Sequence, residues 1–104
     1  MELNSKQRKL LERHAQKLQP VVIVGQNGVT PSVIEMANAT LKIHELIKIG
    51  FNEFKEEKKE LSQEIAASCN AALVRIIGNK AVFYRAAEKK ENRKFEKEIQ
   101  KLSD

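Results

Sequence analysis

A four-residue loop with glycine at each end is the segment of this chain best suited to bind a ligand. The loop consists of Gly25, Gln26, Asn27 and Gly28. It follows a β-branched run at residues 21–24 and precedes Thr30, a suitable N-cap for a helix. Because glycine has no Cβ, another backbone can approach this main chain closely. The loop amides and the positive end of the following helix suit a phosphate or a sugar–phosphate backbone.

The glycine spacing favours nucleic acid over a free nucleotide as that ligand. A nucleotide-binding P-loop requires a longer spacing and a Lys-Ser or Lys-Thr pair after the second glycine, which this chain lacks. KH domains use a GxxG loop to clamp nucleic-acid backbone. We therefore expect residues 25–28 and Thr30 to contact RNA backbone. The alternative is that the two glycines only allow a tight turn.

The loop is neutral, so ionic attraction to a polyanion must come from other residues. The 104-residue chain has 19 Lys and Arg against 14 Asp and Glu, a net charge of +5, which makes nucleic acid the first partner to consider. Four cations share one side of the first expected helix. This basic stripe consists of Lys6, Lys9, Arg13 and Lys17. Lys48 and Arg85 are further candidate phosphate contacts, although such cations can also be only a solvated surface.

Catalytic and metal-binding patterns are weak in this sequence. His14, His44 and the single cysteine, Cys69, lack the spacing of metal ligands, and one cysteine cannot form an intrachain disulfide. His44 beside Glu45 is an arrangement that a small enzyme could use as a general base. We expect it instead to satisfy backbone groups at a helix–strand junction. We expect no enzymatic activity, cofactor, metal or small-molecule substrate.

The sequence also lacks the features of membrane and secreted proteins. Its longest aliphatic run, residues 21–24, is far shorter than a membrane span. Residues 1–11 are charged throughout and lack the apolar core of a signal peptide. We expect a cytoplasmic protein that does not contact membranes.

Glycines and prolines divide the chain into elements in the order α-β-α-β-α-β-β-α. We expect helices at residues 5–18, from residue 31 onward, at 53–69 and within 86–104, and strands at 20–24, 45–51, 73–77 and 80–85. Alternating strands and helices imply parallel strands with right-handed crossovers. The last two strands form a hairpin with a two-residue turn, which must add an antiparallel strand. The pattern predicts an α/β fold with a mixed four-stranded sheet.

Hydrophobic periodicity predicts which side chains are buried. The run at residues 20–24 suits a strand that is buried on both faces. The second helix places Met36 and Ile43 on its apolar arc, and the third helix includes Phe54 in its buried stripe. In the hairpin, counting outwards from the turn assigns the core face to Val74, Ile76, Ala81 and Phe83. Tyr84 falls on the opposite face, where we expect it to pack under a helix rather than stack on a base.

Several segments together resemble a known family. They are residues 5–8 (SKQR), 18–30 (LQPVVIVGQNGVT), 44–49 (HELIKI), 77–78 (IG) and 83–85 (FYR). Over about residues 3–86 the chain closely resembles the YhbY-like CRM domain family, named for chloroplast RNA splicing and ribosome maturation. The HELIK run, at its distance from the GxxG loop, is much more specific than GxxG alone.

The resemblance implies a KH-like α-β-α-β-α-β-β RNA-binding domain at residues 1–86, followed by a charged C-terminal helical extension at 87–104. It implies that residues 25–28 contact RNA. Single-domain bacterial members are regarded as assembly factors associated with precursors of the large ribosomal subunit, so the resemblance implies ribosomal RNA as partner. The chain departs from the family at Gln16, where relatives often have His. It also departs at Asn70, where Gly often ends the third helix.

An adaptor between proteins is the alternative function. The extension has Phe95, Ile99 and Leu102 at helical spacing, and these could dock a partner while the basic residues remain incidental.

Overall fold

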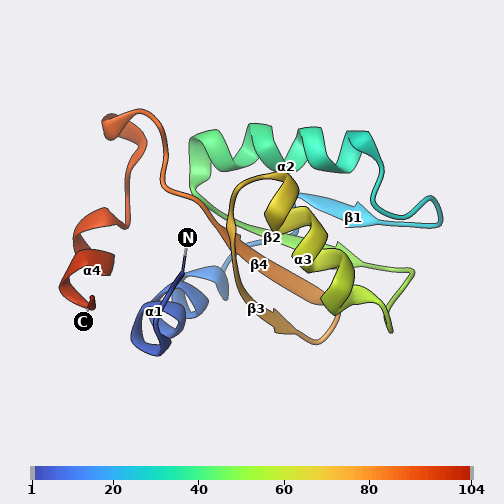
Figure 1. Cartoon of the computed structure of the whole chain (residues 1–104), viewed down its shortest axis with the longest axis horizontal. Coiled ribbons are helices and arrows are strands. Elements are labelled where there is room, and N and C mark those ends of the chain that lie inside the picture. The colour runs from blue at the N-terminus through green and yellow to red at the C-terminus, as the bar shows by residue number, and fades with distance from the viewer. Residues whose placement is uncertain (1, 104) are drawn as a thin grey trace.

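The computed structural model describes residues 2–103, which form helices on both faces of one four-stranded sheet (Figure 1). In chain order the elements are α1 (Ser5–Ala15), β1 (Val22–Val24), α2 (Pro31–His44), β2 (Leu46–Phe51), α3 (Lys58–Ser68), β3 (Ala72–Ile77), β4 (Lys80–Tyr84), the 3₁₀ helix η1 (Lys90–Asn92) and α4 (Glu96–Lys101). The strand order is β1-β2-β4-β3. β1 is parallel to β2, and β4 is antiparallel to both of its neighbours. The predicted mixed sheet is confirmed.

Polar side chains begin the first two helices as the sequence predicts. The Asn4 side chain accepts from the Gln7 N–H at 2.8 Å, and the Gln7 side chain accepts from the Asn4 N–H at 2.9 Å, which completes a capping box. The Thr30 hydroxyl accepts from the Val33 N–H at 3.3 Å, with Pro31 in the first turn of α2. These caps fix where α1 and α2 start, and hence where the GxxG loop ends.

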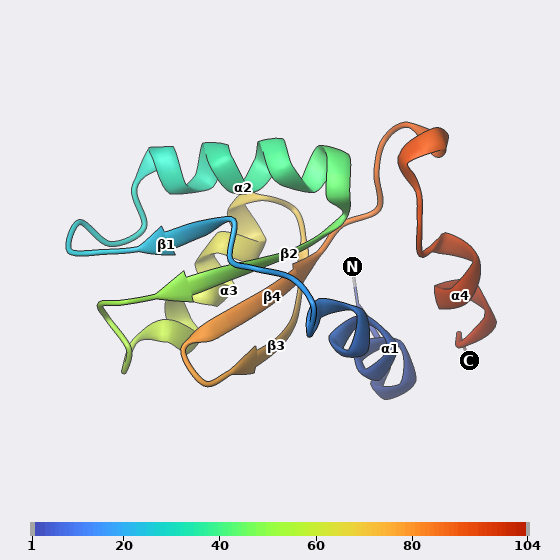
Figure 2. The ribbon, with the colours of Figure 1, turned by 180° about the vertical axis from the view of Figure 1, so that it is seen from behind.

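The two faces of the sheet are covered differently (Figure 2). α2 and α3 cover what we call the closed face, whose buried core includes Val24, Val33, Ala37, Leu41, Ile47, Ile49, Phe51, Ile65, Ala81 and Phe83. α1 packs on what we call the open face, with a second core that includes Leu10, Leu11, Ala15, Leu46, Val74, Val82, Tyr84 and Ile99. Two hydrophobic layers thus enclose the sheet.

Three burial predictions are wrong because the helices cover less surface than the periodicity implied. β1 is an edge strand, and its Ile23 side chain is 45% exposed rather than buried. In α2 the buried residues are spaced four apart, at Val33, Ala37 and Leu41, so only a narrow stripe meets the sheet. Met36 and Ile43 therefore lie in solvent.

The third helix begins at Lys58, five residues later than predicted. The N–H groups of Asn52 and Glu53 both donate to the Val24 carbonyl, at 3.0 and 3.4 Å, and so tie this segment to the end of β1. Phe54 follows with a φ of 56°, which an α-helix does not allow. Its side chain is consequently exposed rather than buried in the α3 stripe.

A β-bulge changes the predicted facing of the hairpin. The register of β3 against β4 shifts between Leu73 and Arg75, so Val74 turns to the open face while Ile76 and Phe83 stay with the closed core. The Arg8 guanidinium of α1 donates to the carbonyls of Leu73 and Val74, at 2.7 and 2.9 Å. Counting outwards from the turn missed the bulge because this bond comes from a helix 65 residues away along the chain.

The C-terminal extension folds back on α1. The Asn4 side chain donates to the Leu102 carbonyl at 2.6 Å, and the Gln7 side chain donates to the Ile99 carbonyl at 3.0 Å. Phe95, Ile99 and Leu102, the proposed docking stripe of an adaptor, belong to the open-face core. Tyr84 lies under this layer and is almost completely buried, as predicted.

Candidate nucleic-acid interface

The GxxG loop forms an exposed turn at one end of the long axis of the molecule (Figure 1). The Gly28 N–H donates to the Gly25 carbonyl at 3.0 Å, and Gly28 has a φ of 71° that other residues adopt at a cost. Apart from the two chain neighbours of Gly25, no described residue lies within 4 Å of a Cβ placed there. Gln26 and Asn27 are exposed at the tip. The main chain is therefore accessible, with the capped start of α2 directly behind it.

An aromatic side chain that the sequence analysis did not assign to the site lies beside this loop. Two Phe54 ring carbons come within 3.6 and 3.8 Å of a Cβ placed on Gly28. Nothing in the local pattern indicated this position, because Phe54 fits the apolar spacing of a longer α3. The same segment, residues 53–57, carries three exposed Glu and one exposed Lys and is therefore net acidic. The immediate neighbours of the loop are thus an aromatic ring and an acidic segment.

The basic stripe lies apart from the GxxG loop. Lys6, Lys9 and Arg13 are exposed on α1 and line a shallow hollow against Lys101 of α4. In both views α1 and α4 lie toward the end of the molecule opposite the loop (Figures 1 and 2). Lys17, just beyond α1, is also exposed. The structure therefore does not bring the stripe and the loop into one continuous patch.

Lys48 is the candidate cation nearest the middle of the sheet. Its side chain projects from β2 onto the open face and is only 9% exposed. Burial, with a smaller contribution from the charge of Lys80, lowers the pKa of Lys48 below its usual value. Lys48 therefore lies on the same face of the sheet as α1.

Arg85 is occupied inside the fold. Its guanidinium donates to the Asn38 side chain at 2.9 Å, the Asn38 carbonyl at 3.2 Å and the Cys69 carbonyl at 2.6 Å. It thus joins α2 to the end of α3, where burial raises the pKa of the Cys69 thiol. These contacts give Arg85 a structural role that its sequence position did not indicate.

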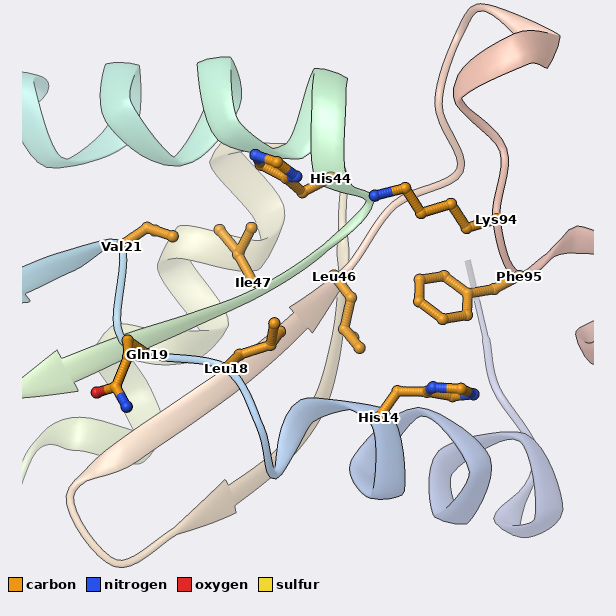
Figure 3. Close-up of a pocket in the computed structure, with 9 residues that line it drawn as sticks. All are labelled: His14, Leu18, Gln19, Val21, His44, Leu46, Ile47, Lys94 and Phe95. Carbon is orange, nitrogen blue, oxygen red and sulfur yellow. The ribbon is translucent and has the colours of Figure 1, made fainter.

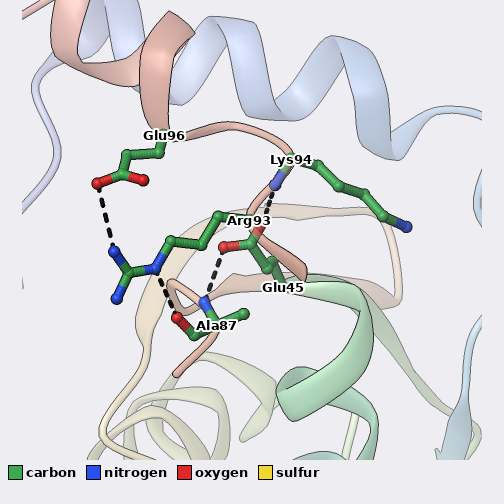
Figure 4. A network of polar contacts seen from close by, with 5 residues as sticks. All are labelled: Glu45, Ala87, Arg93, Lys94 and Glu96. Atoms are coloured by element: carbon green, nitrogen blue, oxygen red, sulfur yellow. Dashed lines mark hydrogen bonds and ion pairs between the residues drawn. The ribbon is translucent and has the colours of Figure 1, made fainter. Parts of the chain in front are cut away.

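Glu45 anchors the C-terminal extension (Figure 4). It is fully buried with a φ of 62° at the end of α2. One carboxylate oxygen accepts from the Ala87 N–H at 2.8 Å and the other accepts from the Lys94 N–H. Arg93 donates to the Ala87 carbonyl at 2.7 Å and pairs with Glu96 at 3.4 Å. Both oxygens of Glu45 are therefore used by the fold, and they are not directed to a partnership with His44.

A cavity of about 300 Å³ lies between α1, the end of α2 and the extension (Figure 3). It is lined by His14, Leu18, Gln19, Val21, His44, Leu46, Ile47, Lys94 and Phe95. The His14 ring contacts Phe95, with centroids 5.0 Å apart, and its Nε2 lies 3.6 Å from a Glu98 oxygen. Phe95 also meets Tyr84 edge-on at 6.3 Å. Within residues 2–103, no group of three or more His, Cys, Asp or Glu is placed to hold a metal ion.

Among the helices of that same range, none is both long and apolar enough to cross a bilayer.

Comparison with known proteins identifies a family. Residues 3–85 match the CRS1/YhbY (CRM) domain. The chain is 33% identical over 95 residues to Probable RNA-binding protein YqeI of Bacillus subtilis, covering 90% of this chain and 97% of that one. It is 38% identical over 87 residues to an RNA-binding protein of Haemophilus influenzae, covering 83% and 88%.

A solved structure has the same fold. It is the solution structure of SAV1595 from Staphylococcus aureus, a hypothetical protein described as a candidate RNA-binding protein. The TM-score is 0.75 at 29% sequence identity, over 89% of this chain and 98% of that one.

Proposed function

Since the chain belongs to the CRS1/YhbY (CRM) domain family, we propose that it binds RNA through the GxxG loop. The observation that carries this proposal is the accessible main chain at Gly25, followed by the capped start of α2. Relatives named as RNA-binding proteins support it.

In this proposal the loop and the cations have separate tasks. The peptide groups at residues 25–28 and the N-terminus of α2, with Thr30, cradle one stretch of RNA backbone. The basic stripe (Lys6, Lys9, Arg13 and Lys17) and Lys48 attract and hold phosphates elsewhere on the strand. Arg85 contributes indirectly, because its guanidinium already holds α2 and α3 together. The acidic segment beside the loop would disfavour phosphates on that side and so orient the strand.

We further propose ribosomal RNA in precursors of the large subunit as the target, with the protein acting as an assembly factor and not an enzyme. The family resemblance supports this target. The commitment of Glu45 to the fold supports the non-enzymatic role.

The loop is tested by Gly25→Asp. The new Cβ meets open space, so the fold should persist while a carboxylate repels the backbone. We expect the Kd for a ribosomal RNA fragment, measured by fluorescence anisotropy, to rise at least about tenfold, or roughly 1.4 kcal/mol. Gly28→Asp should weaken binding as well, but the φ of 71° there adds strain. Gln63→Glu, an exposed change of equal charge on α3, is the control. An unchanged Kd in folded Gly25→Asp would remove the loop from the mechanism.

The stripe is tested by its salt dependence. Replacing Lys9 and Arg13 by Gln should reduce the slope of log K against log salt by about 0.7 for each phosphate that the variant no longer neutralises. An unaltered slope would show that the stripe is only solvated surface.

The RNA target is tested by crosslinking in cells. Reads should concentrate on the large-subunit RNA and its precursor ends. A distribution without ribosomal enrichment would overturn the target while leaving RNA binding in place.

A further inference from the structure

Part of the open face is not covered by α1. A row of paired residues crosses all four strands there: Ile23 of β1 lies opposite Gly50 of β2, Gly50 opposite Lys80 of β4, and Lys80 opposite Ile77 of β3. Ile23 and Ile77 are 45% and 43% exposed, and Lys80 is exposed as well. The two exposed isoleucines thus lie on opposite edge strands of one face, with Gly50 and the exposed Lys80 between them.

Glycine keeps the centre of this row flat. A Cβ at Gly50 would lie 2.8 Å from the Ile23 Cδ1 and 3.7 Å from Pro20 atoms. Any other residue would displace Ile23 from its place over the β2 backbone. Gly50 therefore leaves room for the Ile23 side chain to lie over the β2 backbone, next to Lys80 of the neighbouring strand.

A hollow of about 540 Å³ adjoins the row on the same face. Lys48 and Lys80 line it from the sheet, Glu12 and Gln16 from α1, and residues 78–79 from the hairpin turn. Lys48, opposite Val82, is two residue pairs from the row and therefore faces the same side of the sheet. Lys48 is only 9% exposed, and it is one of the residues that line the hollow.

Two lysines and one carboxylate line the hollow. No ion pair within residues 2–103 includes Lys48 or Lys80. The carboxylate that lines the hollow, Glu12, pairs with Arg75 at 3.3 Å. Burial and Lys80 both disfavour the charged form of Lys48. Two neighbouring cations of this kind are stabilised by an added anion.

We propose that Lys48 and Lys80 bind phosphates of a single-stranded RNA segment that crosses the open face over the row Ile23–Gly50–Lys80–Ile77. Phosphodiester oxygens accept the lysine N–H groups, and Ile23 and Ile77 contact ribose or base. This inference rests on the proposed function and adds Lys80 and the two isoleucines to the interface.

The position of the hollow explains how separated contacts could serve one strand. At one side it is bounded by α1, which carries the basic stripe. At the other side is the 78–79 turn, where the Asn79 carbonyl accepts from the Phe51 N–H at 2.8 Å. Phe51 directly precedes the segment whose Phe54 ring lies at Gly28. The hollow therefore lies between the helix that carries the stripe and the turn that is bonded to the chain leading to Phe54.

The test compares Lys48→Met with Lys80→Gln, alone and together, for binding of a single-stranded RNA oligonucleotide. We expect each single change to raise the Kd several-fold, and the pair to reduce the salt slope by about 1.4, or about 0.7 for each phosphate released. In the unaltered protein, RNA should shift the Lys48 side-chain NMR signals and raise its pKa. Lys42→Gln with Lys89→Gln, an exposed pair of equal charge outside the hollow, should change the slope less.

The outcomes separate this inference from the proposed function. If Gly25→Asp abolishes binding while the Lys48/Lys80 pair leaves Kd, slope and NMR signals unchanged, the hollow is not part of the interface. If the unaltered protein binds no RNA, both proposals are wrong. If polyglutamate shifts the Lys48 signals and RNA does not, the occupant is an acidic protein segment. Because Lys80 is exposed, Lys80→Gln remains informative even if Lys48→Met unfolds.

Discussion

The two faces of the sheet differ in how completely the helices cover them. On the closed face, α2 and α3 cover the sheet with an apolar core that runs from Val24 to Phe83. On the open face, α1 and the extension cover only part of the strands and leave Lys80 and two isoleucines at the surface beside the largely buried Lys48. The same four strands thus carry a sealed core on one side and an accessible surface on the other.

Apolar residues are exposed on the open face because the helices cover that face only in part. Side-chain alternation along β1 and β3 places Ile23 and Ile77 on the open face, and none of the described helices covers them. The buried core of the open face is the part that α1 and the extension cover. The open face can therefore tolerate residues that suit a ligand better than a core.

The largest expected contrast compares one core residue with one surface residue. Phe83→Ala on the closed face should lower the free energy of unfolding by about 3–5 kcal/mol because it leaves a cavity. Ile77→Ala on the open face should change it by about 0.5 kcal/mol or less. Urea denaturation measures both. If both changes lowered the free energy of unfolding by a similar amount, the two positions would contribute equally to stability. That result would contradict the contrast between the two faces.

The second-largest expected effect is at Glu45, whose carboxylate binds the extension beside the open-face core. Glu45→Gln replaces an acceptor of two N–H groups with an amide that can accept only through its oxygen. We expect a loss of about 1–3 kcal/mol and faster amide exchange at Ala87 and Lys94. Glu88→Gln, an exposed neighbour, should be neutral. If amide exchange at Ala87 and Lys94 were unchanged in Glu45→Gln, the extension would be held by α1 alone.

Alkaline pH should distinguish two groups on the open face. Burial, with the nearby charges of Glu45 and Glu96, raises the pKa of Tyr84 to about 12. The unfolded tyrosine loses its proton near pH 10, so between pH 10 and 12 the unfolded state binds fewer protons and stability falls as pH rises. The loss approaches roughly 2–3 kcal/mol.

Lys48 acts with the opposite sign. Its folded pKa is lowered, so the unfolded chain binds more protons just below the ordinary lysine pKa and stability rises with pH there. Thermal unfolding of Tyr84→Phe should lack the alkaline loss, and Lys48→Met should lack the gain. Parallel pH profiles for the two variants and the unaltered protein would contradict both assignments.

The smallest expected effect is at the end of α3 on the closed face. Asn70 has a φ of 51°, which glycine adopts without strain, so Asn70→Gly should raise the unfolding free energy by up to about 1 kcal/mol. Asn79→Gly is the matched change in the hairpin turn, where the Asn side chain accepts from Lys58 at 3.3 Å. It should stabilise less. A larger gain at Asn79 would contradict the role assigned to Asn70.

Local signals were sufficient for most of the fold. Caps at Asn4 and Thr30, the turn at residues 78–79 and the left-handed Asn70 all act within a few residues, so their sequence patterns predict the structure. Long-range bonds account for the late start of α3 and for the bulge in β3. Val24 holds the segment that was expected to start α3, and Arg8 binds the bulge at Val74.

The candidate site was predicted in part for the same reason. The GxxG loop depends on neighbouring residues and is exposed as expected. Its surroundings depend on which segments pack beside it, so the place of Phe54 and the separation of the basic stripe were not predictable.

By itself, the sequence determined the order of elements, the mixed sheet and the GxxG turn, because periodicity, caps and glycine spacing are local properties. Only the tertiary structure decided which cations have internal partners and which lie beside another cation. Arg85 is enclosed by α2 and α3, while Lys48 is brought next to a second cation, Lys80. The physical reason is that a charge's role depends on its neighbours in space, and strand pairing brings together residues far apart in the chain.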